Sequence, residues 1–198
     1  MRIAVLASGS GSNFEALVKA GRRRDFGGEI SLLVCNKSDA YALERAKKLK
    51  VEFNYILPST FPSRKEYEQA LGDLLDFKNI DIILLAGYML VLGRDFIKRF
   101  DGRILNIHPS YLPDLPGLKV IERAFKSERA YTGVTVHEVD AGLDSGPVVI
   151  QQKVPIKETD SLASLEARIH ALEHSLYPKA VKMFIGRHTA GAVRRKKK

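Results

Sequence analysis

Residues 1–100 switch between two hydrophobic patterns, and each pattern predicts a different element. Nearly unbroken apolar runs are typical of strands buried on both faces. They predict strands at 2–7, 30–35, 51–57 and 81–85. Apolar residues that recur every three or four positions predict helices at 13–19, 39–49 and 63–77. Because strands alternate with helices, we expect a parallel sheet covered on both faces.

Residues 101–188 carry a different order of elements. The last two strands are joined by the short loop 140–146 and are expected to form an antiparallel hairpin. Leucines and isoleucines then step by three and four along one amphipathic helix, which Pro178 is expected to kink or end. The predicted fold class is α/β: a Rossmann-like, mostly parallel twisted sheet with helices on both faces and an antiparallel element in the C-terminal half. The elements predicted here are strands at 103–108, 132–139 and 147–154 and a helix at 118–125.

Composition is typical of a single-domain globular protein. The chain has 198 residues, 45% of them hydrophobic, which is enough to bury a sizeable core. Its only cysteine, Cys35, excludes an internal disulfide and fits a reducing cytosol. The first apolar run is too short for a signal peptide, and no run reaches the roughly 18 apolar residues of a membrane span. We therefore expect a cytoplasmic protein with no membrane partner.

The net charge of +9 is concentrated in part at one end of the chain. Five of the positive charges form the run Arg194–Lys198, within a basic tail predicted at 189–198. We interpret the tail as solvated, because nothing in it resembles a folded nucleic-acid-binding module. No nucleic-acid partner is expected, and residues 1–188 are predicted to form one domain.

The first candidate site is the turn Ser8–Asn13, which follows the first strand and begins the first helix. Glycines let a ligand approach the backbone closely, and unpaired amides at a helix N-terminus attract phosphate. The turn lacks the dinucleotide fingerprint and also lacks the Gly-Lys-Ser/Thr of triphosphate-binding loops. A monophosphate therefore fits best, with a serine-capped tight turn as the purely structural alternative.

The second candidate site is at the end of the strand 103–108. Asn106 and His108 point to the same side of an extended strand, and Pro109 prevents the strand from continuing. An amide and an imidazole with the Asp144 carboxylate nearby are suited to stabilising an oxyanion and moving protons. A carboxylate in contact with His108 would favour the protonated imidazole. Serine-hydrolase and metal-site patterns fit less well, because the chain has neither G-x-S-x-G nor H-E-x-x-H.

Two further segments have both a structural and a functional interpretation. His170, Glu173 and Tyr177 share one side of the long helix. They form either a partly packed surface or a site where the carboxylate grips a cationic or hydroxylated ligand. The apolar segment 87–92 follows a buried strand and forms either core or the wall of a slot for a flat heterocycle.

Taken together, these motifs resemble the phosphoribosylglycinamide formyltransferases, the folate-dependent enzymes of purine synthesis. The match extends over nearly the whole chain. It departs from the family pattern at Asp114 and Lys119 and in the basic tail. The matching motifs are S-G-x-G-S-N at 8–13, Cys35-Asn36-Lys37, L-A-G-[FY]-M at 85–89, N-I-H-P-S-x-L-P at 106–113, L-D-x-G-P at 143–147 and E-H-x-x-Y-P at 173–178.

The resemblance implies formyl transfer from 10-formyltetrahydrofolate to the amine of 5'-phosphoribosylglycinamide in de novo purine biosynthesis, with no metal and no ATP. The products would be N-formylglycinamide ribonucleotide and tetrahydrofolate. It implies that the catalytic residues are Asn106, His108 and Asp144. The residues implied to bind the ribonucleotide are Gly11, Ser12, Asn13 and Glu173. Those implied to bind the folate are Arg64, Met89, Leu90, Val91, Leu92, Asn106, Asp140 and Asp144.

The same resemblance divides the domain into a phosphate-binding half, residues 1–100, and a catalytic half, residues 101–188, in a monomer or homodimer. Two other functions stay open at this level. A methionyl-tRNA formyltransferase shares the N-x-H and L-D-x-G elements, but the turn 8–13 fits a small phosphorylated substrate and no second, tRNA-binding domain is expected. A non-catalytic nucleic-acid binder would bind through the tail, with a steep salt dependence that disappears when residues 194–198 are removed.

Overall fold

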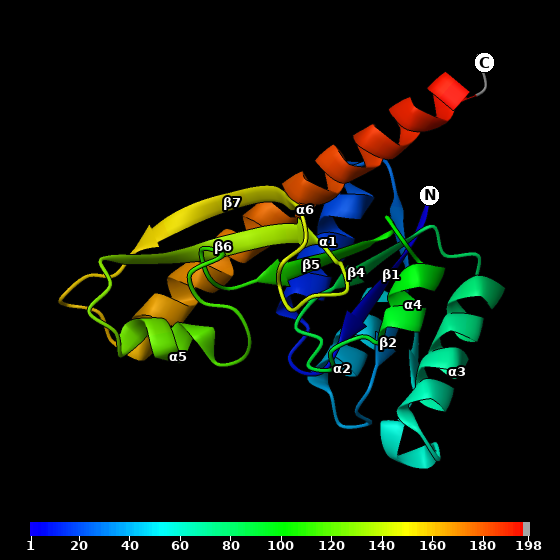
Figure 1. Cartoon of the computed structure of the whole chain (residues 1–198), viewed down its shortest axis with the longest axis horizontal. Coiled ribbons are helices and arrows are strands. Elements are labelled where there is room, and N and C mark those ends of the chain that lie inside the picture. Colours follow the sequence, from blue (N-terminus) through cyan, green and yellow to red (C-terminus); the bar gives the residue numbers. More distant parts are fainter. Residues whose placement is uncertain (196–198) are drawn as a thin grey trace.

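One seven-stranded sheet, ordered β3-β2-β1-β4-β5-β6-β7, organises the chain (Figure 1). The computed structural model describes residues 1–195, with only the backbone described at 188–195. All pairs from β3 to β5 are parallel, whereas the β5-β6 and β6-β7 pairs are antiparallel. The predicted fold class and the C-terminal hairpin are therefore confirmed. The strands are β1 (Arg2–Ala7), β2 (Glu29–Cys35), β3 (Glu52–Tyr55), β4 (Ile82–Leu85), β5 (Ile104–His108), β6 (Tyr131–Glu138) and β7 (Val148–Pro155).

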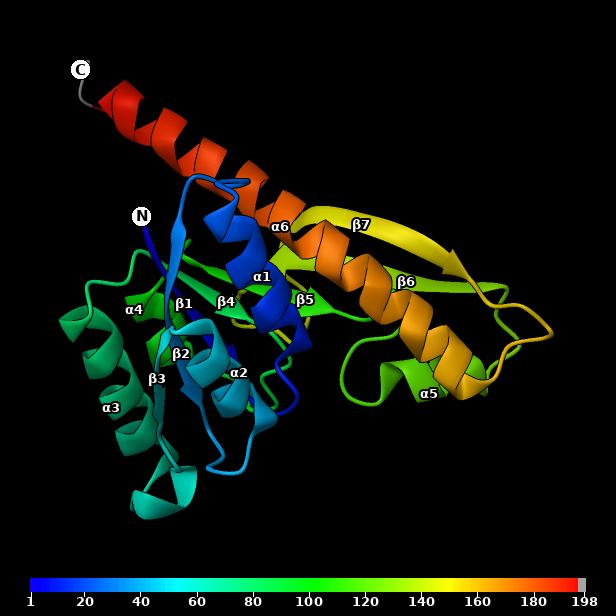
Figure 2. The same ribbon diagram turned by 180° about the vertical axis from the view of Figure 1, so that it is seen from behind.

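Helices cover both faces of the sheet (Figures 1 and 2). The sequence pattern does not predict α4 or η1, because each has too few residues to show a period. Helix α5 begins two residues later than predicted, after Lys119 in a left-handed conformation with φ 54°. The helices are α1 (Ser12–Arg22), α2 (Tyr41–Leu49), η1 (Pro58–Thr60), α3 (Arg64–Phe77), α4 (Arg94–Arg99), α5 (Val120–Phe125) and α6 (Leu162–Arg195).

Strand β1 separates two hydrophobic cores. Ile3 and Val5 pack into the core that contains residues of α1, α2 and α6, whereas Ala4 and Leu6 pack into the core that contains residues of α3 and α4. Successive side chains of a strand point to opposite faces, so an unbroken apolar run fills both layers. Figure 2 shows α1 and α6 over the first of these faces. The prediction of a doubly covered sheet is thus confirmed.

Of the two effects expected of Pro178, ending the helix does not occur. Helix α6 continues past this proline. Beyond it, Ala180, Val181 and Phe184 are fully buried in the same core as the apolar residues that precede it. Burial of a continuous apolar face therefore outweighs the loss of the backbone hydrogen bond that a proline cannot make.

The end of α6 covers most of the segment predicted as a basic tail. The backbone of residues 189–195 is helical. Residues 196–198, the remainder of that segment, lie outside the described residues. The proposed division at residue 189 stays a prediction.

Candidate active site

The carboxyl ends of β1, β4 and β5 lie at one edge of the sheet, where open α/β sheets bind ligands. Strand β1 leads into the turn that begins at Ser8, and β4 leads into the segment that contains Met89. These two segments are joined directly. The Ser8 amide donates to the Gly87 carbonyl over 3.1 Å, and the Met89 amide donates to the Ser8 hydroxyl over 2.8 Å. The predicted phosphate and pterin segments are therefore neighbours.

Asn106, His108 and Asp144 lie together at this edge, and Asn106 and His108 share a face, as their spacing of two residues predicts. Strand β5 ends at His108. Asn106 Nδ2 donates to Asp144 Oδ1 over 3.3 Å, and His108 Nδ1 lies 3.6 Å from Asp144 Oδ2. The loop between β6 and β7 thus delivers a carboxylate to two side chains on one face of β5.

The hydrogen bonds of His108 define where it can exchange a proton. Nε2 lies 2.8 Å from the Leu115 carbonyl. A carbonyl only accepts, so Nε2 carries a hydrogen and Nδ1, which faces Asp144, is the exchangeable position. Burial lowers the pKa of His108 below its ordinary value and outweighs the raising effects of Leu115 and Asp144. Asp144 therefore favours the protonated imidazole, as expected, but burial disfavours the cation and has the larger effect.

Asp144 is held as a carboxylate by the groups around it. Its backbone is left-handed, with φ 51°. Its Oδ2 accepts a hydrogen bond from the Gly117 amide over 2.9 Å. Burial raises the pKa of Asp144, but the neighbouring His137 and His108 rings and the hydrogen bond from the Gly117 amide outweigh it and lower the pKa. The loop therefore presents a charged acid at the site.

His137 belongs to this cluster, although the sequence analysis does not identify it. It lies on β6 directly opposite Asn106 and is 2% exposed. Its Nδ1 donates to the Glu138 carbonyl over 2.9 Å, so Nε2 is an acceptor and takes a hydrogen bond from Asn106 Nδ2 over 3.1 Å. The alternation of β6 shows that His137 is on the face of Thr135, but nothing in the pattern fixes the register with β5.

The turn after β1 has the geometry of an anion site. Gly11 is left-handed, with φ 73°, and caps α1 without a side-chain hydrogen bond. A Cβ at Gly11 would lie only 2.6 Å from the Ala42 Cβ. Ser12 and Asn13 are the first residues of α1, where amides lack intrahelical partners and the helix dipole favours negative charge. Glycine is needed here both for its conformation and for the space it leaves.

Helix α6 contributes a carboxylate to the same turn. Glu173 is 4% exposed, and its Oε2 accepts from Asn13 Nδ2 over 3.1 Å and from His170 Nδ1 over 2.8 Å. The hydrogen bond to Glu173 raises the pKa of His170. Tyr177 is fully buried instead, and its hydroxyl contacts the carbonyls of Leu85 and Leu105. Of these residues, Glu173 and its partner His170 therefore belong to the site, whereas Tyr177 belongs to the core.

A comparison with protein families shows which family the chain belongs to. Residues 1–181 match the family described as formyl transferase. The chain belongs to the formyl transferase family. It carries the Asn106, His108 and Asp144 cluster described above within the matched region.

Relatives of this formyl transferase are similar over most of their length. Phosphoribosylglycinamide formyltransferase of Bacillus subtilis (strain 168) is 38% identical over 190 residues, which cover 96% of this chain and 97% of the relative. The enzyme of the same name from Haemophilus influenzae is 41% identical over 183 residues, covering 92% of this chain and 86% of the relative. The crystal structure of phosphoribosylglycinamide formyltransferase from Bacillus halodurans superposes with a TM-score of 0.89 and 41% identity, covering 92% of this chain and 94% of that one.

The predicted folate residues of the formyl transferase have different environments. Arg64 is the first residue of α3, and Met89 and Val91 expose their side chains. Leu92 is buried in the core with α3 and α4, and Leu90 packs against that core. Their predicted contact with folate stays a prediction, with Met89 and Val91 best placed to touch a ligand.

The loop that carries Asp144 is braced at its start. Asp140 Oδ1 accepts from the Gly142 amide over 3.0 Å and from the Ser145 hydroxyl over 2.9 Å. This turn shapes the segment 140–144, which the sequence analysis assigns to folate binding. Asp140 therefore acts on the shape of the loop itself.

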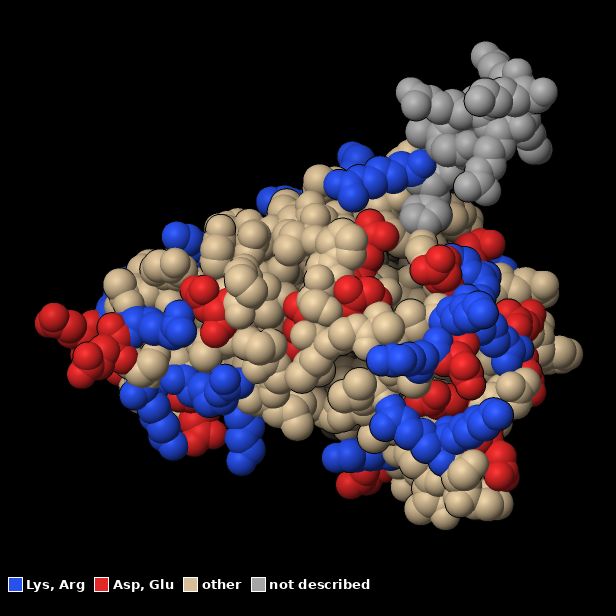
Figure 3. All heavy atoms as spheres, in the orientation of Figure 1, with Lys and Arg blue, Asp and Glu red and all other residues tan. Residues whose placement is uncertain are grey.

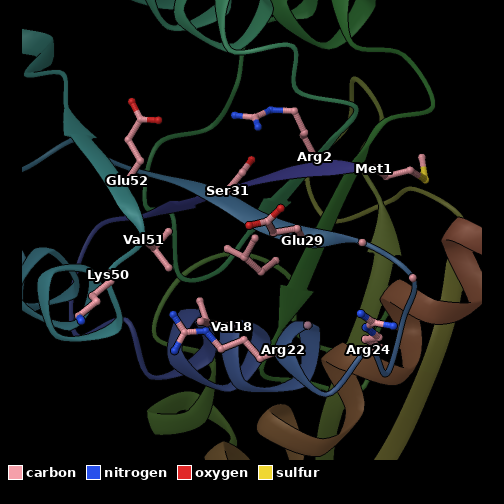
Figure 4. A pocket seen from close by; sticks show the side chains of 14 residues that line it. Met1, Arg2, Val18, Arg22, Arg24, Glu29, Ser31, Lys50, Val51 and Glu52 are labelled. Atoms are coloured by element: carbon pink, nitrogen blue, oxygen red, sulfur yellow. The ribbon is translucent and has the colours of Figure 1, made fainter.

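One hollow of the formyl transferase lies away from this site. A cavity of about 820 Å³ is found at the amino ends of β1 and β2, with Arg22, Arg24 and Lys50 in its lining (Figure 4). Arg22 donates to the Leu49 carbonyl at the end of α2. Cations at helix C-termini are favoured by the helix dipole, which accounts for this cluster structurally.

No helix of residues 1–195 combines the length and the apolar character that a membrane crossing requires. Within the same residues, no group of three or more His, Cys, Asp or Glu side chains is arranged to hold a metal ion.

Proposed function

We propose that this formyl transferase moves the formyl group of 10-formyltetrahydrofolate to the amine of 5'-phosphoribosylglycinamide. The products are N-formylglycinamide ribonucleotide and tetrahydrofolate, in de novo purine biosynthesis. The observation that carries the proposal is the convergence of Asn106, His108 and Asp144 beside an anion-binding turn. The similarity to enzymes named phosphoribosylglycinamide formyltransferase supports it.

The ribonucleotide lies with its phosphate at the first turn of α1. The amides of Gly11, Ser12 and Asn13 bind the phosphate, because the helix N-terminus favours an anion. Glu173 contacts the ribose or the glycinamide end and is oriented for this by Asn13 and His170. This arrangement directs the substrate amine toward the end of β5.

The folate occupies the adjoining segment. Met89 and Val91, with the backbone from Leu90 to Leu92, border the pterin, and the loop 140–144 closes over it. Arg64 binds the carboxylate tail. Because the Met89 amide is hydrogen-bonded to Ser8, the folate segment and the phosphate turn hold the two substrates side by side.

The reaction needs stabilisation of a negative oxygen and movement of one proton. The neutral amine attacks the formyl carbon, and charge builds on the formyl oxygen. Asn106 Nδ2 donates to that oxygen in exchange for one of its present acceptors, His137 or Asp144. His108 accepts the proton of the attacking amine at Nδ1, since Nε2 is occupied by Leu115. It passes this proton to the folate nitrogen as the bond between that nitrogen and the formyl carbon breaks, which releases tetrahydrofolate. The formyl group arrives activated on the folate, so the proposed reaction needs neither metal nor ATP.

The remaining expectations about the cellular setting are part of the same proposal. We infer a cytoplasmic enzyme, supported by a single cysteine that is a free, buried thiol, whose pKa burial raises to about 12. We also infer that neither a membrane nor a nucleic acid is a partner. The substrates are small molecules, and the enzyme acts as a monomer or homodimer.

A spectrophotometric assay of the purified protein tests the proposal. Phosphoribosylglycinamide with 10-formyltetrahydrofolate is expected to give saturable release of tetrahydrofolate, whereas initiator methionyl-tRNA should not replace the ribonucleotide. His108→Ala should lower kcat by about 10² to 10⁴, the usual contribution of a group that transfers a proton in the transition state. Circular dichroism verifies that the variant is folded. Turnover with tRNA alone, or wild-type turnover in His108→Ala, would reject the proposal.

A further inference from the structure

Glu68 is a buried acid on α3 that no part of the proposed mechanism uses. Only 9% of the residue is exposed. Burying a carboxylate is costly unless hydrogen bonds and opposite charge compensate it. It lies one helical turn after Arg64, the residue proposed to bind the folate tail. The hydrogen-bond partners of the Glu68 carboxylate therefore indicate why it is buried.

One oxygen of Glu68 holds two parts of the proposed folate site together. Oε1 accepts from Arg64 Nε over 2.8 Å and from the Gly93 amide over 2.9 Å. Arg64 begins α3, whereas Gly93 directly follows the segment 89–92 that is proposed to border the pterin. The carboxylate thus fixes the tail-binding residue relative to the pterin segment.

Gly93 provides the space for this contact. A Cβ at this position would lie 2.4 Å from Glu68 Oε2. The φ of Gly93 is −74°, a value that any residue adopts, so a larger residue here would displace the end of the Glu68 side chain without straining the backbone. The contact between α3 and the segment 89–92 therefore depends on the residue types at both Glu68 and Gly93.

The contact also determines how Arg64 presents its charge. A guanidinium carries five N–H groups in a planar fork, and its Nε side is taken by Glu68. The edge formed by Nη1 and Nη2 is left for a two-point contact with another carboxylate. The Arg64 side chain is 56% exposed and borders a cavity of about 330 Å³ that Lys65 and Arg94 also line. Figure 3 shows Lys and Arg on this side of the molecule, over α3 and α4, with Asp and Glu among them.

We propose that Glu68 is a positioning residue for co-substrate binding: held by the Gly93 amide, its carboxylate orients Arg64 toward a carboxylate of the folate tail. The inference rests on the proposed function. It assigns to Glu68 an effect on folate affinity that requires the tail carboxylate, and no role at the reacting atoms.

Steady-state kinetics of Glu68→Ala test this role. The KM for 10-formyltetrahydrofolate should rise about tenfold, the effect of losing about one oriented charged hydrogen bond, while kcat and the ribonucleotide KM stay within about twofold. Glu68→Gln keeps an acceptor oxygen and should recover most of the affinity. Glu44→Gln removes the carboxylate of an exposed ion pair on α2 and is the matched control, with no expected change.

A second co-substrate separates positioning from general structural support. With 10-formyltetrahydropteroate, which lacks the glutamate tail, Glu68→Ala should have the same KM as the wild type. In an Arg64→Ala background, Glu68→Ala should add no further rise in the folate KM. Equal increases with both co-substrates would overturn the proposal, because Glu68 would then support only the pterin segment. No increase with either would overturn it as well.

A substitute variant and the activity of the wild type make the result of this experiment interpretable in every case. If Glu68→Ala does not fold, Glu68→Asp carries the same test, because the shorter side chain keeps its charge but cannot reach both donors. The wild-type reaction separates this inference from the proposed function. An inactive wild type rejects both, whereas an active wild type with an unaltered Glu68→Ala rejects the positioning role alone.

Discussion

At the scale of the residue, the proposed acid–base chemistry depends on one nitrogen atom of His108, Nδ1. Burial lowers the pKa of His108, and Asp144 partly opposes that effect. Asp144→Asn removes the opposing charge, so the pKa of His108 should fall further and the histidine limb of the pH–kcat profile should move to lower pH. We also expect a severe loss of kcat. Turnover measured from about pH 5 to pH 9, the range in which histidine titrates, checks both.

Asp114→Asn is the control for this experiment. Asp114 is a carboxylate of the neighbouring loop and pairs with Arg129 over 3.3 Å, not with His108. Its replacement should leave the histidine limb in place. A limb that does not move in Asp144→Asn would show that Asp144 orients the site without tuning His108.

The sequence predicts site residues whose position follows from alternation along one strand. It misses those whose position depends on how two elements pair. Asn106 and His108 are two residues apart on one strand, so their common face follows from the sequence alone. His137 reaches Asn106 only through the β5-β6 register, which alternation does not fix. Glu68 is visible as an i, i+4 partner of Arg64, but its burial and its contact with Gly93 depend on tertiary packing.

At the scale of the element, α6 joins the proposed phosphate site to a titratable group. His170 has a raised pKa because Nδ1 is hydrogen-bonded to Glu173, so the cation persists to higher pH and is lost as pH rises through that pKa. A cation beside the phosphate turn strengthens anion binding. The ribonucleotide KM should therefore rise between about pH 6 and pH 8 in the wild type and rise less in His170→Gln.

The comparison of the two proteins at each pH cancels the titration of the substrate phosphate. Folate KM serves as the internal control, because His170 is placed beside the turn and not beside the folate segment. Identical pH dependence of the ribonucleotide KM in both proteins would show that His170 does not contribute to phosphate binding.

Helix α6 also shows why residue type alone does not predict where a helix ends. Proline is unfavourable within a helix, and the sequence rule favours a break at Pro178. Tyr177 next to it is anchored by contacts of its hydroxyl with the carbonyls of Leu85 on β4 and Leu105 on β5. Tertiary packing on the sheet, which a local rule does not include, keeps the helix continuous.

At the scale of the whole molecule, the site is assembled from both halves of the chain. The hydrogen bond from Asn13 to Glu173 joins residues 160 positions apart. The phosphate turn also packs on α2, where the Ala42 amide donates to the Gly9 carbonyl over 3.0 Å. Ribonucleotide affinity should therefore depend on how α1 and α2 pack, at a distance from the folate segment.

Gly11→Ala tests that dependence. The new Cβ would meet the Ala42 Cβ at 2.6 Å in a backbone with φ 73°, so the turn must shift away from α2. We expect the ribonucleotide KM to rise at least tenfold and the free energy of unfolding to fall by about 1–3 kcal/mol, as for a strained left-handed residue. The folate KM should stay nearly constant. In Gly9→Ala the Cβ meets nothing within 4 Å, so both changes should be much smaller. Equal effects of the two substitutions would show that the turn is adaptable and that contact with α2 does not set its shape.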